Sequence, residues 1–189
     1  MDQAHAPLVI LDRDGVINRD SPDFIKSADE FEPLPGSIDA IADLCRAGYR
    51  VVIASNQSGI GRGLFTTETL VRIHGKLREL VEAAGGALSG IFFCPHKPDD
   101  GCECRKPGTG LMDQIAAAFE RDLGDVPAIG DSMRDLEAAA AAGARPILVR
   151  TGNGHATERD LPATSDIPVY DDLRAAADAI LAADGDPAR

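Results

Sequence analysis

A run of branched apolar residues, Leu8 to Leu11, is followed at once by two carboxylates and a glycine, Asp12, Asp14 and Gly15. Such a run is typical of a strand that is buried on both faces of a parallel sheet. Because ligands bind at the carboxyl ends of the strands in an open α/β sheet, Asp12 and Asp14 are placed where chemistry can occur. A plain strand followed by an Asp-Gly turn would give the same pattern, so the rest of the chain has to decide.

Further apolar runs that predict strands alternate with stretches of helical periodicity. Strands are expected at 50–54, 90–94, 126–130, 145–149 and 167–170, with helices between them and a last helix capped by Asp171. This alternation predicts an α/β fold, a Rossmann-like, doubly wound and mainly parallel sheet with helices on both faces. A chain of 189 residues is expected to form a single domain over 1–189.

Two stretches without periodicity, 16–35 and 152–165, are expected to be loops, and the first is expected to lie over the carboxylates. A connection of this length in a compact domain is more often functional than not. Thr66 or Thr67 is expected to cap the helix that contains His74, and His74 is expected to be structural. Helical spacing with neighbouring apolar residues predicts that Cys45 belongs to the core.

The formal net charge of −12 disfavours nucleic acid or an anionic membrane as a partner, because both require a basic surface. An anionic substrate would then be held by a few local cations or by a metal. The sequence has no apolar run of about 18–20 residues, and residues 1–7 lack the features of a signal peptide. We therefore expect a cytoplasmic protein, and we expect a monomer.

Three predicted strand ends carry polar clusters: Asp12 with Asp14, Ser55 with Asn56, and Asp131 with Asp135. Closely spaced carboxylates repel one another unless a cation lies among them, and ligands that are all oxygen favour Mg²⁺. Magnesium commonly keeps phosphate oxygens as ligands, and a carboxylate can attack phosphorus when a metal offsets the repulsion. A second carboxylate two residues further on could move the proton.

Two further features suit a phosphate. Ser55 offers a hydroxyl, and the amides of 56–59 could cradle an anion as a backbone nest. Lys106 could supply positive charge to the transferring phosphoryl group. Lys106 also directly follows a cluster of three cysteines and a histidine, Cys94, His96, Cys102 and Cys104.

This Cys₃His set is the ligand set of a closed structural zinc site, which would fix the loop 94–104 and the two residues after it. Free thiols with a surface histidine are the simplest alternative, and a redox Cys-x-Cys pair is another. We expect zinc because the short Cys-x-His and Cys-x-Cys pairs let two turns supply two ligands each.

Together these segments resemble the haloacid dehalogenase superfamily of phosphatases. The closer resemblance is to the D-glycero-D-manno-heptose 1,7-bisphosphate phosphatases and the related histidinol phosphatases, and it covers residues 8–150 and implies no large cap domain. It implies that Asp12 is the nucleophile and Asp14 the general acid/base. It implies that Asp12, the Asp14 carbonyl and Asp131 hold Mg²⁺, and that Ser55 and Lys106 stabilise the phosphoryl group. The residues that it implies for sugar recognition are Asp20, Ser21, Pro22, Asp23, Asn56, Gln57, Ser58 and Arg105.

The expected activity is Mg²⁺-dependent removal of the 7-phosphate from a small phosphorylated sugar, D-glycero-D-manno-heptose 1,7-bisphosphate, through an aspartyl-phosphate. Histidinol phosphate is the alternative substrate. A zinc-stabilised binding module and a thiol redox protein are the alternatives outside phosphatases. The net charge and the lack of interleaved basic and aromatic residues argue against a nucleic-acid-binding module.

Overall fold

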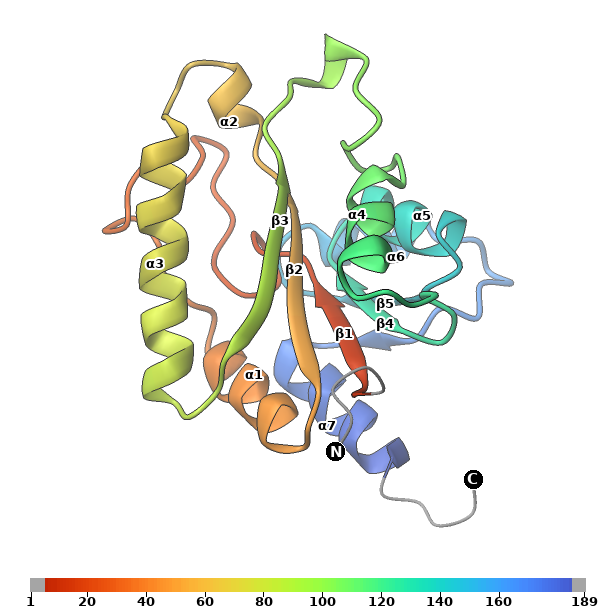
Figure 1. Cartoon of the computed structure of the whole chain (residues 1–189). Helices are drawn as coiled ribbons and strands as arrows, with labels where there is room; N and C mark the ends of the chain where they lie inside the picture. The colour runs from red at the N-terminus through yellow and green to blue at the C-terminus, as the bar shows by residue number, and fades with distance from the viewer. Residues whose placement is uncertain (1–5, 185–189) are drawn as a thin grey trace.

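Six parallel strands form one sheet in the computed structural model, which describes residues 6–184 (Figure 1). Neighbours in the sheet follow the order β3-β2-β1-β4-β5-β6. The strands are β1 (Leu8–Leu11), β2 (Arg50–Asn56), β3 (Leu88–Cys94), β4 (Pro127–Gly130), β5 (Arg145–Val149) and β6 (Val169–Tyr170). The predicted doubly wound parallel sheet is confirmed. Residues 1–5, which bear on the expectation that there is no signal peptide, and residues 185–189 lie outside the described part.

Helices cover both faces of this sheet (Figure 1). They are α1 (Ser37–Arg46), α2 (Ser58–Gly61), α3 (Thr67–Ala83), α4 (Gly110–Ala118), α5 (Met133–Ala141), α6 (Gly154–Asp160) and α7 (Leu173–Asp184). The core on one face packs α1, α3 and α7 against the sheet, and the core on the other face packs α4 and α5 against it. None of the described helices combines the length and the apolar character that crossing a membrane requires.

The central position of β1 in the sheet explains why its sequence is apolar at every position. Val9 and Leu11 belong to the core with α1, whereas Leu8 and Ile10 belong to the core with α4. All four residues are buried because successive side chains of a strand point to opposite faces and both faces are covered.

The loop after β1 is long, but it is fastened to the rest of the molecule. Val16, Ile17 and Phe31 are buried in the core, and Lys76 on α3 donates hydrogen bonds to the carbonyls of Ala28 and Phe31 at 2.7 and 3.1 Å. No large cap is inserted within residues 6–184, since the other long connection, between β3 and α4, holds only a three-residue 3₁₀ turn, η2 (Pro98–Asp100).

Two expectations about the C-terminal third are wrong. The stretch 152–165 contains helix α6, which is short and polar and therefore carries little apolar periodicity. Helix α7 is capped by Asp172, whose Oδ1 accepts from the Ala175 N–H at 2.8 Å, whereas Asp171 forms an ion pair with Arg150 at 2.7 Å.

Expectations elsewhere hold with small shifts. Thr66 caps α3 by accepting from the Thr69 N–H at 3.3 Å. Strand β2 continues through Asn56, beyond its predicted end. Cys45 is half-buried at the edge of the core, where its Sγ donates to the Ala87 carbonyl at 3.3 Å.

The sheet order reverses at β1, because the chain moves to β2 on one side and later returns to β4 on the other. The Asp12 N–H donates to the Ile129 carbonyl of β4 at 2.9 Å, which ties the end of β1 to the end of its neighbour. In doubly wound sheets such a switch point opens a crevice at the carboxyl ends of the strands. Residues 12–14 and 131 therefore lie where a ligand would bind.

Replacing Ile53 by alanine should lower the free energy of unfolding by roughly 2–5 kcal/mol, because the change leaves a cavity in a fully buried part of β2. Val71→Ala is the control, since Val71 on α3 is 61% exposed and should change stability by no more than about 0.5 kcal/mol. Urea denaturation measures both changes. Equal losses in the two variants would contradict this account of the core.

Candidate active site

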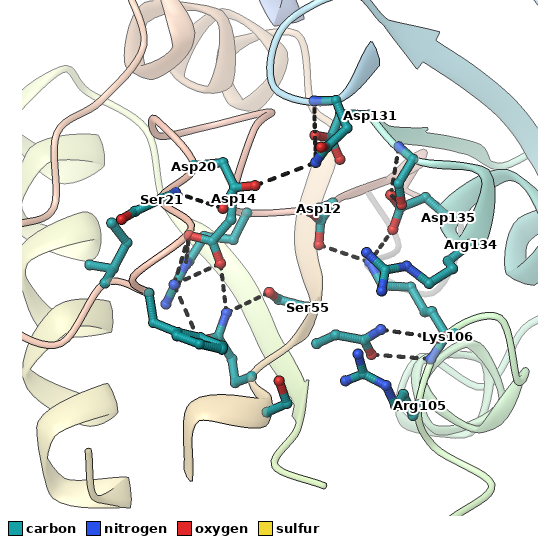
Figure 2. Close-up of a pocket in the computed structure, with 18 of the residues that line it drawn as sticks. Asp12, Asp14, Asp20, Ser21, Ser55, Arg105, Lys106, Asp131, Arg134 and Asp135 are labelled. Atoms are coloured by element: carbon teal, nitrogen blue, oxygen red, sulfur yellow. Dashed lines mark hydrogen bonds and ion pairs between the residues drawn. The ribbon is translucent and has the colours of Figure 1, made fainter. Parts of the chain in front are cut away.

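The carboxyl ends of β1, β2 and β4 open into a pocket of about 330 Å³ (Figure 2). Eleven of the predicted site residues line it: Asp12, Asp14, Asp20, Ser21, Ser55, Asn56, Gln57, Ser58, Arg105, Lys106 and Asp131. Pro22 and Asp23 instead border shallower hollows beside the pocket. The volume lies at the lower end of the ~300–1,000 Å³ typical of small-molecule sites, so it suits a small polar substrate.

The Lys106 side chain is buried beside the pocket, and three elements hold it in place. Its Nζ donates to Asp12 Oδ1 at 2.8 Å and to the Ala54 carbonyl at 2.7 Å, and it lies 2.5 Å from Asp135 Oδ1. The side chain of Asn56 fixes the Lys106 main chain, accepting from its N–H and donating to its carbonyl, both at 3.1 Å. Lys106 is thus positioned at both its backbone and its ammonium group.

The charges around Lys106 shift one another's pKa values. Burial alone would lower the pKa of Lys106, but the carboxylates of Asp12 and Asp135 overcome this effect and raise it. Burial raises the pKa of Asp12 to about 8, against the opposing effect of Lys106. Burial also acts on Asp135, but Lys106 and a hydrogen bond from Ser132 hold its pKa below the usual range. The raised pKa of Asp12 reflects burial first and then the neighbouring carboxylates, and a further cation beside Asp12 would oppose both effects.

Three carboxylates, those of Asp12, Asp131 and Asp135, each bring one oxygen to within 4.8 Å of the others. Lys106 and Ser132 engage both oxygens of Asp135, and the backbone and side-chain amides of Asn153 donate to Asp131 Oδ2 at 2.7 and 3.1 Å. Among the described residues, no hydrogen bond engages Asp12 Oδ2 or Asp131 Oδ1. Burial, followed by the charge of Asp135, raises the pKa of Asp131 to about 6. This set of oxygens fits Mg²⁺, which commonly binds one or two protein carboxylates and completes its shell with water or phosphate.

Two glycines let the chain pass close to Asp131. Gly15 and Gly152 both have positive φ, +85° and +58°. A Cβ on Gly15 would lie 2.2 Å from Asp131 Oδ2, and one on Gly152 would lie 2.1 Å from the same atom. The absence of side chains here therefore determines where the Asp131 carboxylate can lie.

The Asp14 side chain lies apart from the three clustered carboxylates, in a network of its own. Arg13 Nη2 donates to both of its oxygens at 2.8 Å, and Asn18 and Gln57 add hydrogen bonds of 2.9 and 2.8 Å. Gln57 Nε2 also donates to Ser55 Oγ at 2.8 Å. Burial raises the pKa of Asp14, but the charge of Arg13 and these hydrogen bonds more than offset it, so the pKa lies below its usual range. The network therefore holds Asp14 as a carboxylate.

A buried histidine completes this network. His74 Nε2 lies 3.4 Å from Arg13 Nη1, and Arg13 itself is fully buried. Burial first, and then the charge of Arg13, lower the pKa of His74 to about 3. A neutral imidazole nitrogen can accept the hydrogen bond from the guanidinium, so His74 supports Arg13 and through it Asp14.

The backbone nest predicted at 56–59 is smaller than expected. The Gln57 N–H donates to the Cys94 carbonyl at 2.7 Å and is not available to an anion. Ser58 lies at the start of the short helix α2 and lines the pocket.

Cys94, His96, Cys102 and Cys104 converge beyond β3, outside the pocket. The Sγ atom of Cys102 lies 3.6 Å from that of Cys94 and 3.7 Å from that of Cys104, and His96 Nδ1 lies 3.3 Å from Cys104 Sγ. Zn–S bonds of about 2.3 Å in a tetrahedron separate the sulfurs by about 3.8 Å, whereas a disulfide needs about 2.05 Å. The cluster therefore fits a zinc ion and not a disulfide.

Sequence reasoning missed several residues that line the pocket or support it. Arg13 is one of them, although a charged side chain between two aspartates after a buried strand calls for a partner; the expectation that His74 is structural agrees with its buried position and its hydrogen bond to Arg13. Asn153, which directly precedes α6, is another, because the stretch 152–165 carries no periodicity and is expected to be loop. Arg62 and Arg134 also line the pocket, and no motif marks them.

The sequence matches the HAD-hydrolase-like family over residues 103–176 and the polynucleotide kinase 3 phosphatase family over residues 8–134. The fold and the matched families together define a phosphatase of the HAD-like class.

More specific similarities extend over almost the whole chain. A Bordetella bronchiseptica protein named D-glycero-beta-D-manno-heptose-1,7-bisphosphate 7-phosphatase is 52% identical over 92% of this chain and 97% of its own. The crystal structure of D,D-heptose 1,7-bisphosphate phosphatase from B. bronchiseptica, complexed with magnesium and phosphate, has a TM-score of 0.91 at 51% identity and covers 94% of this chain and 99% of its own. The corresponding enzyme from Burkholderia thailandensis has a TM-score of 0.74 at 47% identity and covers 93% and 98%. The chain therefore belongs to the D-glycero-D-manno-heptose-1,7-bisphosphate 7-phosphatase family of the HAD-like phosphatases.

Gly152→Ala should weaken Mg²⁺ binding at least about tenfold, because the new Cβ displaces the Asp131 carboxylate. Gly85→Ala is the matched control: Gly85 also has positive φ, at +85°, but a Cβ there meets nothing within 4 Å. Both variants carry a backbone cost of roughly 1–2 kcal/mol, and only the first should lose metal. Paramagnetic resonance with Mn²⁺ as the probe measures affinity, and equal affinity in the two variants would contradict the role given to Gly152.

Proposed function

We propose that the chain removes the 7-phosphate from D-glycero-D-manno-heptose 1,7-bisphosphate with the help of Mg²⁺, as one domain with a zinc-binding loop at 94–104. The observation that carries the proposal is that Asp12, Lys106 and Asp131 meet at one pocket in a chain 52% identical to a protein named for this activity. The magnesium and phosphate bound in the related B. bronchiseptica structure support the same chemistry.

Asp12 is the proposed nucleophile. Its carboxylate attacks phosphorus, the P–O bond to the sugar breaks, and an aspartyl-phosphate forms on residue 12. Lys106 supports this step because its ammonium lies 2.8 Å from Asp12 Oδ1, next to where charge would gather on the phosphoryl oxygens. Buried Ser55 supports it with a hydroxyl at the end of β2.

Asp14 is the proposed general acid and base. It gives a proton to the departing sugar oxygen and later takes one from the water that attacks the aspartyl-phosphate, which releases phosphate and restores the Asp12 carboxylate. The low pKa of Asp14 suits the second of these roles. The first role requires a proton, and a phosphate dianion arriving nearby favours its uptake because like charges raise the pKa of a carboxyl.

Asp12 and Asp131, with the Asp14 carbonyl that the family resemblance implies, are the proposed Mg²⁺ ligands. The ion would offset the repulsion between the carboxylate nucleophile and the phosphate. Asp135 is better suited to hold Lys106, because both of its oxygens are already engaged. Asn153 would orient Asp131.

Sugar recognition is proposed for the loop after β1 and the segment after β2. Asp20 and Ser21 line the pocket on the side opposite Arg105 (Figure 2). Asn56 and Gln57 also line it, but their side chains are engaged with Lys106 and Asp14, so they act on the substrate chiefly by positioning those groups. Pro22 and Asp23 would shape the loop from outside the pocket.

The zinc site at Cys94, His96, Cys102 and Cys104 is proposed as structural. Its sulfur spacing supports zinc, and Arg105 Nη1 donates to the His96 carbonyl at 3.4 Å, which links the cluster to the pocket wall. A monomeric cytoplasmic protein with no nucleic acid or membrane partner remains our prediction.

Phosphate release with and without Mg²⁺ tests the substrate. The heptose bisphosphate should be turned over faster than histidinol phosphate or a generic phosphomonoester, and only with the metal. Equal, slow release from all three would contradict the proposal.

Asp12→Asn should lower phosphate release by more than about 10³-fold while the protein stays folded, because it removes the nucleophilic carboxylate. Asp39→Asn, at an exposed position on α1, should leave the rate unchanged. Circular dichroism checks folding in both. Substantial turnover by Asp12→Asn would show that another group attacks phosphorus.

Cys104→Ser should lower the zinc content from about one per chain and reduce the melting temperature, because it removes one of four ligands. Cys45→Ser is the control, since Cys45 lies outside the cluster and should leave the zinc content unchanged. Elemental analysis measures both variants. A purified wild-type protein that binds no added zinc would overturn the assignment.

A further inference from the structure

Phe24, in the loop after β1, has a backbone conformation that bulky residues rarely adopt. Its φ is +64°, in the left-handed region that is unfavourable for any residue with a Cβ. Among the described residues other than glycine, Glu120 and Asp125 share this feature, and both are polar and exposed. Phe24 is instead half-buried and lines the pocket. Strained conformations of this kind persist where the surrounding structure enforces them, and they gather at ligand sites.

Contacts on both sides of Phe24 enforce its conformation. The Phe24 N–H donates to the Ser21 carbonyl at 3.0 Å, and the Asp23 N–H donates to Ser21 Oγ at 3.2 Å, which closes a turn. Lys26 Nζ donates to the Asp23 carbonyl at 2.9 Å. Ile25 follows directly and is buried in the core with α1 and α3. The backbone of Phe24 is therefore fixed, and with it the position of the ring at the pocket.

The ring of Phe24 differs in character from most of the pocket. It is the single aromatic side chain among the described residues that line this pocket, and most of the others are charged or polar. The guanidinium carbon of Arg62 lies 5.9 Å from the ring centroid, near the outer limit of a cation–π contact, so the ring also meets the segment after α2. Burying the accessible part of the ring against apolar atoms of a ligand would be favourable, because that surface would leave water.

The departing sugar is the part of the proposed substrate that carries such atoms. Its carbon chain has C–H groups that cannot use hydrogen-bond donors or acceptors, whereas phosphate has none. Figure 2 shows Asp14, Asp20 and Ser21 on one side of the pocket, opposite Lys106. Asp14 is the proposed proton donor to the sugar oxygen, so the sugar belongs on this side. The turn that begins at Ser21 brings Phe24 to the same side.

We propose that Phe24 is a substrate-binding residue whose ring packs against the C–H groups of the departing sugar. This inference rests on the proposed function. The contact adds affinity for the sugar and none for the phosphate alone. The family resemblance implies residues 20–23 for sugar recognition and stops one residue short of Phe24. The unfavourable backbone of Phe24 is retained because it directs the ring into the pocket.

Two variants separate the ring from the backbone, since Phe24→Gly and Phe24→Ala both remove the ring but only glycine relieves the conformation. Both should lower kcat/KM for the heptose bisphosphate by the same factor, roughly 5- to 30-fold, which corresponds to partial burial of the ring. The inhibition constant of inorganic phosphate, which has no C–H groups, should change less than about threefold in either variant. Phe24→Leu should keep part of kcat/KM because its side chain is apolar.

Stability should move differently from activity. The melting temperature should be about 2–8 °C higher for Phe24→Gly than for Phe24→Ala, because only alanine keeps a Cβ in the left-handed region. Glu120→Gly and Glu120→Ala are the matched control pair, since Glu120 has a φ of +50° at an exposed position outside the pocket. The glycine variant should again melt higher, and kcat/KM should be unchanged in both.

Unchanged kcat/KM in Phe24→Ala, or an equally large weakening of phosphate inhibition, would overturn the role of Phe24 and leave the proposed function standing. A loss in Phe24→Ala that Phe24→Gly does not share would show that the backbone matters and the ring does not, and would also overturn this role. A wild-type protein that releases no phosphate from the heptose bisphosphate would overturn the proposed function itself, and the inference with it.

Discussion

The buried ammonium of Lys106 holds this site together. It joins Asp12 after β1, Ala54 on β2 and Asp135 on α5, which are far apart in the sequence. Removing one partner from a buried ion pair typically costs about 3–5 kcal/mol, so these contacts support one another. The Asn56 side chain fixes the Lys106 backbone, and the cysteine cluster lies directly before it. The position of the Lys106 ammonium thus depends on the ends of β1 and β2, on helix α5 and on the loop that zinc is proposed to hold.

Asp12 and Asp14 are only two residues apart, but their environments shift their pKa values in opposite directions. Asp12 lies with Lys106 among other carboxylates, and burial raises its pKa to about 8. Asp14 is held by Arg13, and its pKa is lowered. Environments that push the pKa values of two neighbouring carboxyls apart are how active sites assign different roles to chemically identical groups. The fully buried Arg13, with neutral His74 behind it, is accordingly as much a part of the site as the two aspartates.

Much of the fold and of the site could be predicted because the signals are local. A few neighbouring residues are enough to predict the buried strand β1, the helix α3 and the metal-binding loop. The signals are the all-apolar run, the helical stripe and the paired cysteines. Helix α6 could not be predicted because its sequence is polar. The role of Asn153, which directly precedes this helix, could not be predicted for the same reason. Pairings such as Asn56 with Lys106, 50 residues apart, depend on how β2 and the zinc loop pack together. No periodicity or motif encodes that packing.

The central claim, that Asp12 carries the phosphoryl group, is tested most directly by trapping the intermediate. Borohydride reduces an acyl-phosphate to an alcohol, which would convert the side chain of residue 12 to that of homoserine. Peptide mass spectrometry after reduction during turnover of the heptose bisphosphate with Mg²⁺ should find this change at residue 12 and at no other carboxylate. Steady phosphate release with residue 12 unmodified, or reduction at Asp14 instead, would contradict the account.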